Sequence, residues 1–261
     1  MAQVDPVAEA CRASVAEASL KMLDQVIARL EGDAKAFRKE TLPSPDVVLF
    51  DLNEAGRVYV QAIMPFVREA LQDGAERFLG MAELGNDVWD VSNPRVEEWL
   101  KRKTLQIKTL PETMHADIRR ALVDVVQEGG TIQDMIDRLR EDRPDYEWWK
   151  AERIARTEIV GANNRGAFEG MAQNGIEYKE WSTSEDERVR PANRPGKPGG
   201  KPSRRRGIEW NHRHANREVV AIDQPFIRTG EALMHPGASN GSAGNIIHCR
   251  CTILPSFEAP R

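Results

Sequence analysis

The sequence predicts an α+β protein, in which a helical N-terminal two-thirds is followed by a small mixed C-terminal module with short antiparallel strands. Up to residue 175, apolar residues recur at the three- and four-residue spacing of helix faces, between proline, glycine and capping signals. After residue 175, short apolar stretches alternate with loops rich in glycine, proline and asparagine.

The first two predicted helices are marked by their ends and by their apolar faces. Asp5 is a capping residue, and Pro6 suits the first helical position. The chain breaks at "TLPSPD", and Pro65 then marks either a start or a kink of the second helix. The apolar faces consist of Leu23, Val26, Ile27 and Leu30 in the first helix, and of Ile63, Phe66, Val67, Ala70 and Leu71 in the second.

Further helices are predicted up to residue 175. One begins at Asn93-Pro94, and the doublet Gly129-Gly130 ends the next. Thr131 caps a short helix. The last and longest covers about residues 145–174, with Gly175 as its C-terminal cap.

Three stretches after residue 175 are predicted strands, namely "IEYKEW", "REVVAI" and "NIIHCRCTIL". If residues 246–254 form a strand, alternate side chains share a face. One face then carries Ile247, Cys249, Cys251 and Ile253, and the other carries His248, Arg250 and Thr252.

The composition is that of a soluble protein with a hydrophobic core. The chain has 261 residues, of which 40% are hydrophobic, and its mean hydropathy is -0.55. No apolar run approaches the length of a membrane-spanning helix, and "MAQVDPVAEACRASV" lacks the apolar segment of a signal peptide. Three cysteines do not make a disulfide framework. We therefore expect synthesis in the cytoplasm and no membrane partner.

Basic charge is concentrated in one segment. The formal net charge is -4, yet residues 188–217 contain ten Lys or Arg and one acidic residue. A segment at about residues 191–211, rich in Pro, Gly, Lys and Arg, cannot bury enough apolar surface to fold alone. It could bind double-stranded DNA, dock on an acidic protein, or remain a solvated loop. The DNA or partner contacts would be Lys197, Lys201, Arg204, Arg205 and Arg206, with Trp210 free to stack on an unpaired base.

Cys249 and Cys251 have two interpretations. As small apolar residues on the inner face of a strand they would pack in the core, which is the interpretation we favour. Alternatively, their thiolates bind zinc, with further ligands from His212, His214 and His235. A disulfide between them is disfavoured, because residues two apart in a strand hold their Cα atoms near the upper limit of disulfide reach.

Several stretches occur in an order that resembles a known family. They are "AERIARTEIVGANNRGAFEGMAQNGI", "KEWSTSEDERVR", "NHRHANREVVAIDQPF" and "GEALMHPGASNGSAGNIIHCRCTILP". Together they resemble the phage Mu F-like minor head proteins, a head-morphogenesis family of tailed bacteriophages, over about residues 95–255. We therefore expect two parts: a helical region at residues 1–90 that could dock on a partner, and a Mu F-like domain at residues 91–261.

The family pattern marks a set of positions in this chain. Two departures from the family pattern stand out. His248 replaces the asparagine usual before the first cysteine. The basic segment at about residues 191–211 is an insertion between the Asp-x-Arg-x-Arg element, which begins at Asp186, and the histidine that follows it in the family. The marked positions are Arg156, Thr157, Glu158, Trp181, Asp186, Arg188, Arg190, His212, Phe226, Pro236, Cys249, Arg250 and Cys251.

The resemblance implies a structural role in a virion. Such proteins are present in few copies in the procapsid, associate with the portal, and have been linked to assembly, DNA packaging or ejection. We therefore expect a virion protein of the head interior or portal region that is assembled in the host cytoplasm. Its expected partners are the portal protein and other head proteins, with packaged DNA as an alternative. No cofactor is expected apart from the zinc alternative.

The alternating residues Asp186, Arg188 and Arg190 are typical of a satisfied salt-bridge network, which Arg156 and Glu158 could extend. A ligand or catalytic site is the other interpretation of such a cluster.

An enzymatic role finds little support in the sequence. The order Arg156, Ser182-Thr183-Ser184, Glu185-Asp186-Glu187 is similar to that of ADP-ribosyltransferases. In those enzymes, however, the acidic element occupies a later strand. The sequence shows no Ser-His-Asp arrangement, phosphate-binding Gly-rich loop or HExxH helix. We therefore expect a protein without enzymatic activity.

Overall fold

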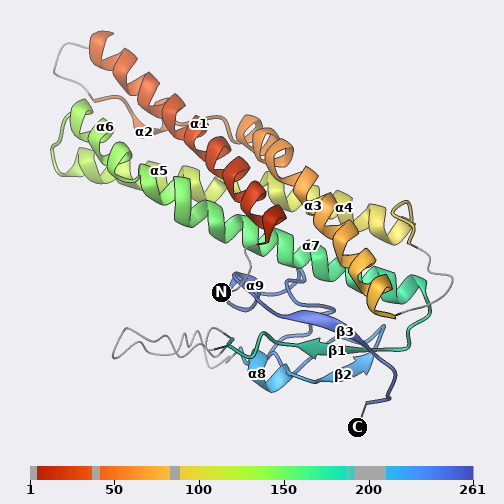
Figure 1. Cartoon of the computed structure of the whole chain (residues 1–261). Coiled ribbons are helices and arrows are strands. Elements are labelled where there is room, and N and C mark those ends of the chain that lie inside the picture. Colours follow the sequence, from red (N-terminus) through yellow and green to blue (C-terminus); the bar gives the residue numbers. More distant parts are fainter. Residues whose placement is uncertain (1–4, 37–41, 83–88, 187–188, 191–209, 261) are drawn as a thin grey trace. The chain divides into compact units, whose positions relative to one another are not determined.

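The computed structural model describes residues 5–36, 42–82, 89–186, 189–190 and 210–260 (Figure 1). Helices make up most of the described chain as far as residue 173, and a three-stranded antiparallel sheet follows. The predicted α+β fold class is therefore confirmed.

The chain forms two compact units, and each consists of two separate stretches. The first unit comprises Met1–Pro65 and Glu98–Ala155, and the second comprises Phe66–Glu97 and Arg156–Arg261. Neither unit ends at residue 90, where the sequence motifs suggest a boundary, because long helices contribute residues to both units. These helices are α3 (Leu52–Ala82), α4 (Pro94–Lys108) and α7 (Ala151–Gln173).

The first unit is helical. Within it, α1 packs against α2, α6 and the π-helix η1, and α5 packs against α2 and α6. Their apolar side chains share one buried core, which includes Leu23, Ile118 and Leu139. None of the described helices is both long and apolar enough to cross a membrane. The elements not yet given are α1 (Pro6–Ala36), α2 (Pro45–Val48), α5 (Pro111–Gln127), α6 (Ile132–Glu141) and η1 (Asp145–Lys150).

The predicted capping residues begin their helices. The side chain of Asp5 accepts hydrogen bonds from the first turn of α1, and that of Asn93 accepts one from the first turn of α4. Thr131 and Asp134 form a reciprocal capping box at the start of α6. Pro65 does not start a helix, because α3 continues through it.

Glycines with positive φ end two helices as predicted. Gly129, with φ 72°, follows α5, and Gly175, with φ 70°, follows α7. After Gly175, the amide of Ile176 donates to the carbonyl of Met171 at 3.0 Å. This is the Schellman arrangement, in which glycine takes a conformation that costs other residues strain.

The single helix predicted over residues 145–174 is wrong in its first part. Residues 145–150 form the π-helix η1, and α7 begins only at Ala151. Apolar periodicity cannot distinguish one π turn from an α turn over so short a stretch. Tyr146 of η1 is buried in the core of the first unit.

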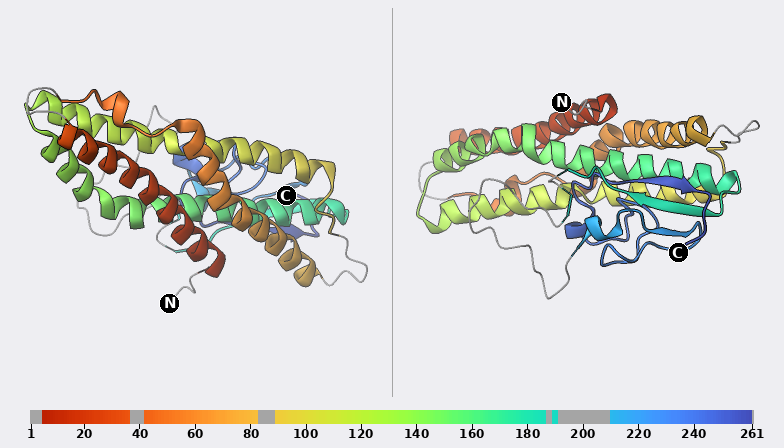
Figure 2. Two further views of the ribbon diagram at one scale, coloured as in Figure 1. Left: turned by 90° about the horizontal axis from the view of Figure 1, so that it is seen from above. Right: turned by 60° about the horizontal axis from the view of Figure 1, so that its bottom comes forward.

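The second unit contains the sheet, whose strand order is β2-β1-β3. Trp181 of β1 pairs with Ile253 of β3, and both side chains are buried. Figure 2 shows the sheet alongside α7, whose Phe168 and Met171 join the sheet in one core. The elements are β1 (Tyr178–Ser182), α8 (His212–Ala215), β2 (Val219–Ala221), α9 (Ala243–Ile246) and β3 (Thr252–Ser256).

The predicted strand over residues 246–254 is wrong in its first part. β3 begins at Thr252, after the cysteines, and His248 has φ 56°, which a strand residue does not adopt. Cys249 and Cys251 are nevertheless buried, at 2% and 3% exposure. Their place in the core therefore does not come from strand alternation.

Within the second unit, α3 and α7 approach each other through glycines. A Cβ atom on Gly166 of α7 would lie 1.9 Å from the carbonyl oxygen of Leu71 and 3.0 Å from the amide nitrogen of Ala75. A Cβ atom on Gly74 of α3 would lie 2.0 Å from the carbonyl oxygen of Asn163. Only residues without a side chain allow two helix backbones to come this close.

Candidate functional site

A buried cluster of one histidine and two cysteines lies in the second unit. Nδ1 of His212 is 3.3 Å from Sγ of Cys251 and 3.6 Å from Sγ of Cys249. Among the described residues, no other three His, Cys, Asp or Glu side chains bring their ligand atoms within 4.8 Å of one another. We call these three residues the His-Cys-Cys cluster.

The structure does not bring the other two predicted ligands into the cluster. His214 lies on the same short helix as His212 but is exposed. His235 is buried, and its Nδ1 donates a hydrogen bond to the carbonyl of Pro236 at 3.0 Å.

Three short segments position the His-Cys-Cys cluster. His212 is the first residue of α8, whose start is capped by the side chain of Asn211. Cys249 follows α9 and donates its amide to the carbonyl of Ile246 at 3.1 Å. Cys251 directly precedes β3.

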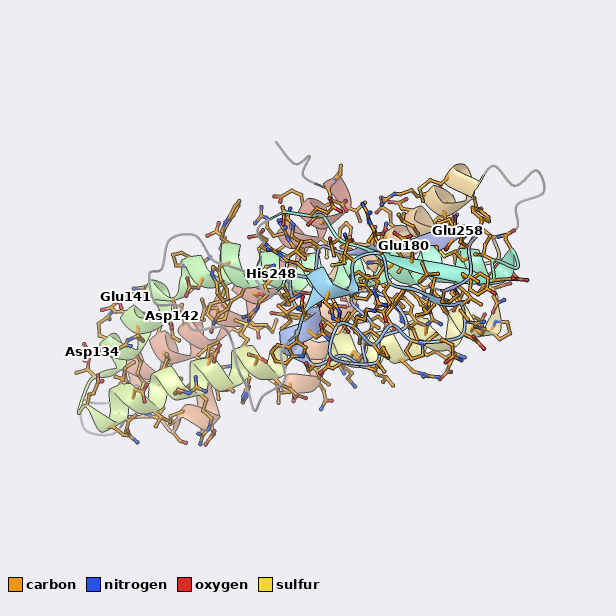
Figure 3. All side chains as sticks on the ribbon, turned by 90° about the horizontal axis from the view of Figure 1, so that it is seen from below. Asp134, Glu141, Asp142, Glu180, His248 and Glu258 are labelled. Atoms are coloured by element: carbon orange, nitrogen blue, oxygen red, sulfur yellow. The ribbon has the colours of Figure 1, made fainter. Side chains whose placement is uncertain are left out.

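Helix α7 fixes the backbone on both sides of the cysteines. The hydroxyl of Thr157 accepts a hydrogen bond from the amide of His248 at 3.3 Å, and Figure 3 labels His248. The side chain of Asn164 donates to the carbonyl of Cys251 at 3.0 Å and accepts from the amide of Ile253 at 3.2 Å. Thr157 belongs to the recognised Ala-Arg-Thr-Glu motif, whereas sequence reasoning did not single out Asn164.

Hydrogen bonding determines which nitrogen of His212 carries the proton. The carboxylate of Glu231 can only accept, so the amide nitrogen of Asn245, 3.0 Å away, faces it. The amide oxygen of Asn245 then faces Nε2 of His212 at 2.5 Å, and Nε2 must donate. In the neutral ring, Nδ1 therefore presents a lone pair to the two sulfur atoms.

The outer end of this relay stays charged near neutral pH. Burial raises the pKa of Glu231, but hydrogen bonds from Ser242 and Asn245 outweigh it and place the pKa below its ordinary value. The ionised carboxylate keeps the orientation of Asn245, and through it that of the His212 ring.

The two thiols of the cluster differ in pKa, because they interact with each other. The hydrogen bond from Cys251 lowers the pKa of Cys249, and burial opposes this change. The same hydrogen bond, together with burial, raises the pKa of Cys251. The guanidinium of Arg190 lies beside Cys249 and also donates to the carbonyl of Ile247. Cys249 is thus the more acidic thiol of the pair.

Aromatic rings cover the cluster. Trp181 packs edge-on against His212 and against Phe226, with a centroid separation of 5.3 Å in each pair. A thiol, an imidazole and an amide in this order resemble the parts of a cysteine nucleophile. Because His212 is only 1% exposed and both cysteines are buried, a bulky substrate cannot reach the sulfur atoms. The arrangement suits holding an ion or a proton rather than attacking a substrate.

The remaining motif residues surround this cluster or support the core. Asp186 pairs with Arg250 at 3.5 Å, whereas the sequence suggested Arg188 or Arg190. Arg188 lies outside the described residues, and Arg190 is beside Cys249. Arg156 and Glu158 lie on α7, and Glu158 is buried. Phe226 and Pro236 are also buried.

Most residues predicted to contact DNA, namely Lys197, Lys201, Arg204, Arg205 and Arg206, lie outside the described part of the chain. Trp210 is described and half-buried. A Cβ atom on Gly244 of α9 would lie 2.4 Å from the ring of Trp210, so the backbone of α9 packs directly against that ring. Of the elements similar to ADP-ribosyltransferases, Ser182 ends β1 and Glu187 is outside the described residues.

Lys179 on β1 is a buried charge that sequence reasoning missed. Its Nζ donates to the carbonyls of Ile222 and Met234, each at 2.9 Å, and lies over the rings of Phe168 and Phe226. Burial lowers its pKa from 10.5 to about 7, and the charge of Asp223 opposes this change. Strand alternation could have indicated this position, because Lys179 shares the inner face of β1 with Trp181.

Lys179 should make the free energy of unfolding depend on pH. Between about pH 7 and 10.5 the unfolded chain binds a proton that the folded chain lacks, so stability should rise with pH in this window. The slope contributed by one such group is at most about 1.4 kcal/mol per pH unit. Urea unfolding of the wild type and of Lys179→Met across this range isolates the contribution, because other groups titrate alike in both. Parallel stability curves would mean that the carbonyls and rings keep Lys179 charged.

Comparisons with known proteins bear on the resemblance seen in the motifs. The model of the family described as Phage Mu protein F like protein matches residues 116–196. This match confirms the resemblance over a range that includes α7 and β1 but ends before the His-Cys-Cys cluster. The uncharacterized protein YqbB of Bacillus subtilis (strain 168) is 23% identical over 245 residues, which cover 92% of this chain and 73% of that protein. No solved structure matches the chain significantly.

Proposed function

From the match of residues 116–196 to the Mu F-like family, we propose that this chain is a minor head protein of a tailed phage or prophage. It acts in head morphogenesis, in association with the portal, at the stage of procapsid assembly, DNA packaging or ejection. The family match is the observation that carries this proposal. The order of the motifs beyond residue 196 supports it as well, because the chain continues in the family's pattern to the cysteines.

The structural features agree with a role in assembly rather than in chemistry. The cluster that most resembles a catalytic arrangement is buried. Of the motif residues next to it, Thr157 accepts a hydrogen bond from the backbone amide of His248, and Trp181 packs against the ring of His212. A protein that docks on others needs a stable module more than an open cleft. We therefore propose that the recognised motif maintains this module.

The test is genetic and uses the phage or prophage that encodes the chain. A nonsense codon at Trp99 should reduce infectious particles by orders of magnitude, and a wild-type copy supplied in trans should restore them. Quantitative mass spectrometry of purified heads should find the chain in few copies, together with the portal protein. Normal particle yield from the mutant, with the chain absent from wild-type heads, would refute the proposal.

A second candidate function is sequence-independent DNA binding, favoured by the ten Lys or Arg within residues 188–217. The complementing copy used above can carry alanine at Arg204, Arg205 and Arg206. If DNA is the main partner, this variant enters heads but leaves them poorly filled. The salt slope of its DNA binding in vitro should then fall by about 3. The control removes three exposed charges of α4, namely Lys101, Arg102 and Lys108.

A further inference from the structure

The His-Cys-Cys cluster has the spacing of ligands around one metal ion. Zinc lies about 2.3 Å from a cysteine sulfur and about 2.0 Å from a histidine nitrogen, so a tetrahedral sulfur and nitrogen ligand are about 3.5 Å apart. In the structure, Nδ1 of His212 is 3.3 Å and 3.6 Å from the two sulfur atoms. All three ligand atoms lie within 4.8 Å of one another, so one ion could contact all of them. We propose that His212, Cys249 and Cys251 form a zinc site.

The orientation of the histidine ring supports metal binding. A ligating imidazole uses one nitrogen for the metal and donates from the other to an oxygen that fixes its tautomer. Here Nε2 donates to Asn245, which Glu231 orients, and Nδ1 is left with its lone pair toward the sulfur atoms. This relay is the outer-shell support that a zinc-bound histidine needs, and simple core packing does not require it.

The chemistry of the donors selects the class of metal. Two thiolates and an imidazole prefer zinc or another soft transition metal, whereas calcium and magnesium take oxygen ligands. Two thiolates also neutralise a divalent cation, so the occupied site could remain in a core lined by Trp181 and Phe226. The guanidinium of Arg190, beside Cys249, can donate to a bound thiolate.

The site is also held in place before any metal arrives. Thr157 and Asn164 of α7 bind the backbone on both sides of the cysteines, and Asn211 caps the helix that begins with His212. The chain thus orders the ligands through its own fold, so metal binding adds stability to the folded state alone. Among the described residues, no further His, Cys, Asp or Glu brings a ligand atom within 4.8 Å of all three, so the site consists of these three side chains.

Metal content of the full chain is the first measurement. Protein produced without a histidine tag, added metal or chelator should contain about one zinc per chain by elemental mass spectrometry. Cobalt(II) added to the zinc-free protein should give the thiolate charge-transfer and d–d bands of tetrahedral coordination. Removal of zinc with a chelator should lower the melting temperature and expose both thiols to a thiol reagent. This part needs no variant, so a failure to fold cannot obscure it.

Variants then assign the ligands. His212→Gln should abolish stoichiometric zinc, whereas His214→Gln, on the same helix but exposed, should retain it. Asn245→Ala should weaken zinc affinity by about 10- to 100-fold, because it removes the support of the ring without removing a ligand. Affinity is measured by competition with a chromophoric chelator.

Three outcomes would overturn the proposal. Folded wild-type protein that contains no zinc and gives no cobalt–thiolate band would leave the cysteines as core packing. A mass lower by two hydrogens with no free thiols at residues 249 and 251 would show a disulfide instead. Zinc that His212→Gln retains in full would place the metal elsewhere. None of these results bears on head morphogenesis, which the genetic test addresses separately.

Discussion

Gly166→Ala should destabilise the protein by about 3 kcal/mol or more, because α3 and α7 would be forced apart. The added Cβ would lie 1.9 Å from the carbonyl oxygen of Leu71, which belongs to a helix backbone and cannot turn away as a side chain could. Relief requires a shift of one helix, and Phe78 and Phe168 in the adjoining core would lose packing with it. Urea unfolding followed by circular dichroism measures the loss.

Gly80→Ala is the matched control for this prediction. Gly80 is exposed on α3, and a Cβ atom there would have no neighbour within 4 Å. The same substitution should therefore stabilise the protein by about 0.5–1 kcal/mol through helix propensity. Equal effects at both positions would show that the glycines act only through propensity and that the close approach of α3 and α7 is wrong.

Asn164→Ala should cost about 2–5 kcal/mol, because it leaves two buried backbone groups without partners. The side chain donates a hydrogen bond to the carbonyl of Cys251 and accepts one from the amide of Ile253. Asn164 is only 2% exposed, so water cannot replace these hydrogen bonds. The segment with the cysteines should also loosen. Both thiols should then react with a thiol reagent faster than in the wild type under native conditions.

Asn163→Ala provides the comparison at the adjacent position. Asn163 is half-buried, and its side-chain oxygen accepts a long hydrogen bond from the guanidinium of Arg77, at 3.4 Å. Its loss should cost less than about 1 kcal/mol and leave thiol reactivity unchanged. If Asn164→Ala proved equally mild, α7 would not be the element that fixes the cysteines.

The helices could be predicted because their signals are local. Asp5, Thr131, Gly129 and Gly175 act on backbone groups within one helical turn, so the sequence around each is sufficient. The segment before β3 could not be predicted in the same way. The positive φ of His248 is held by Thr157, which is distant in sequence, and no local pattern reports such a contact.

The candidate site was predictable in its residue types but not in its geometry. His212, Cys249 and Cys251 were named as possible ligands, yet so were His214 and His235, and spacing alone could not separate them. The roles of Asn245 and Glu231 depend on α8, α9 and the segment with Glu231 meeting in space. Lys179 escaped notice because lysine in a strand is usually assigned to the solvent face, although alternation with Trp181 placed it inside.

The divided make-up of the two units has a consequence for synthesis on the ribosome. The first unit cannot close until Ala155 has emerged, and residues 66–97 must wait for partners that begin at Arg156. Neither unit can therefore fold as an early, independent intermediate while the nascent chain is short, and apolar faces of α1 and α3 stay exposed for most of translation. By the same logic, a cut anywhere between residues 66 and 155 breaks both units at once, so fragments ending there should aggregate rather than fold.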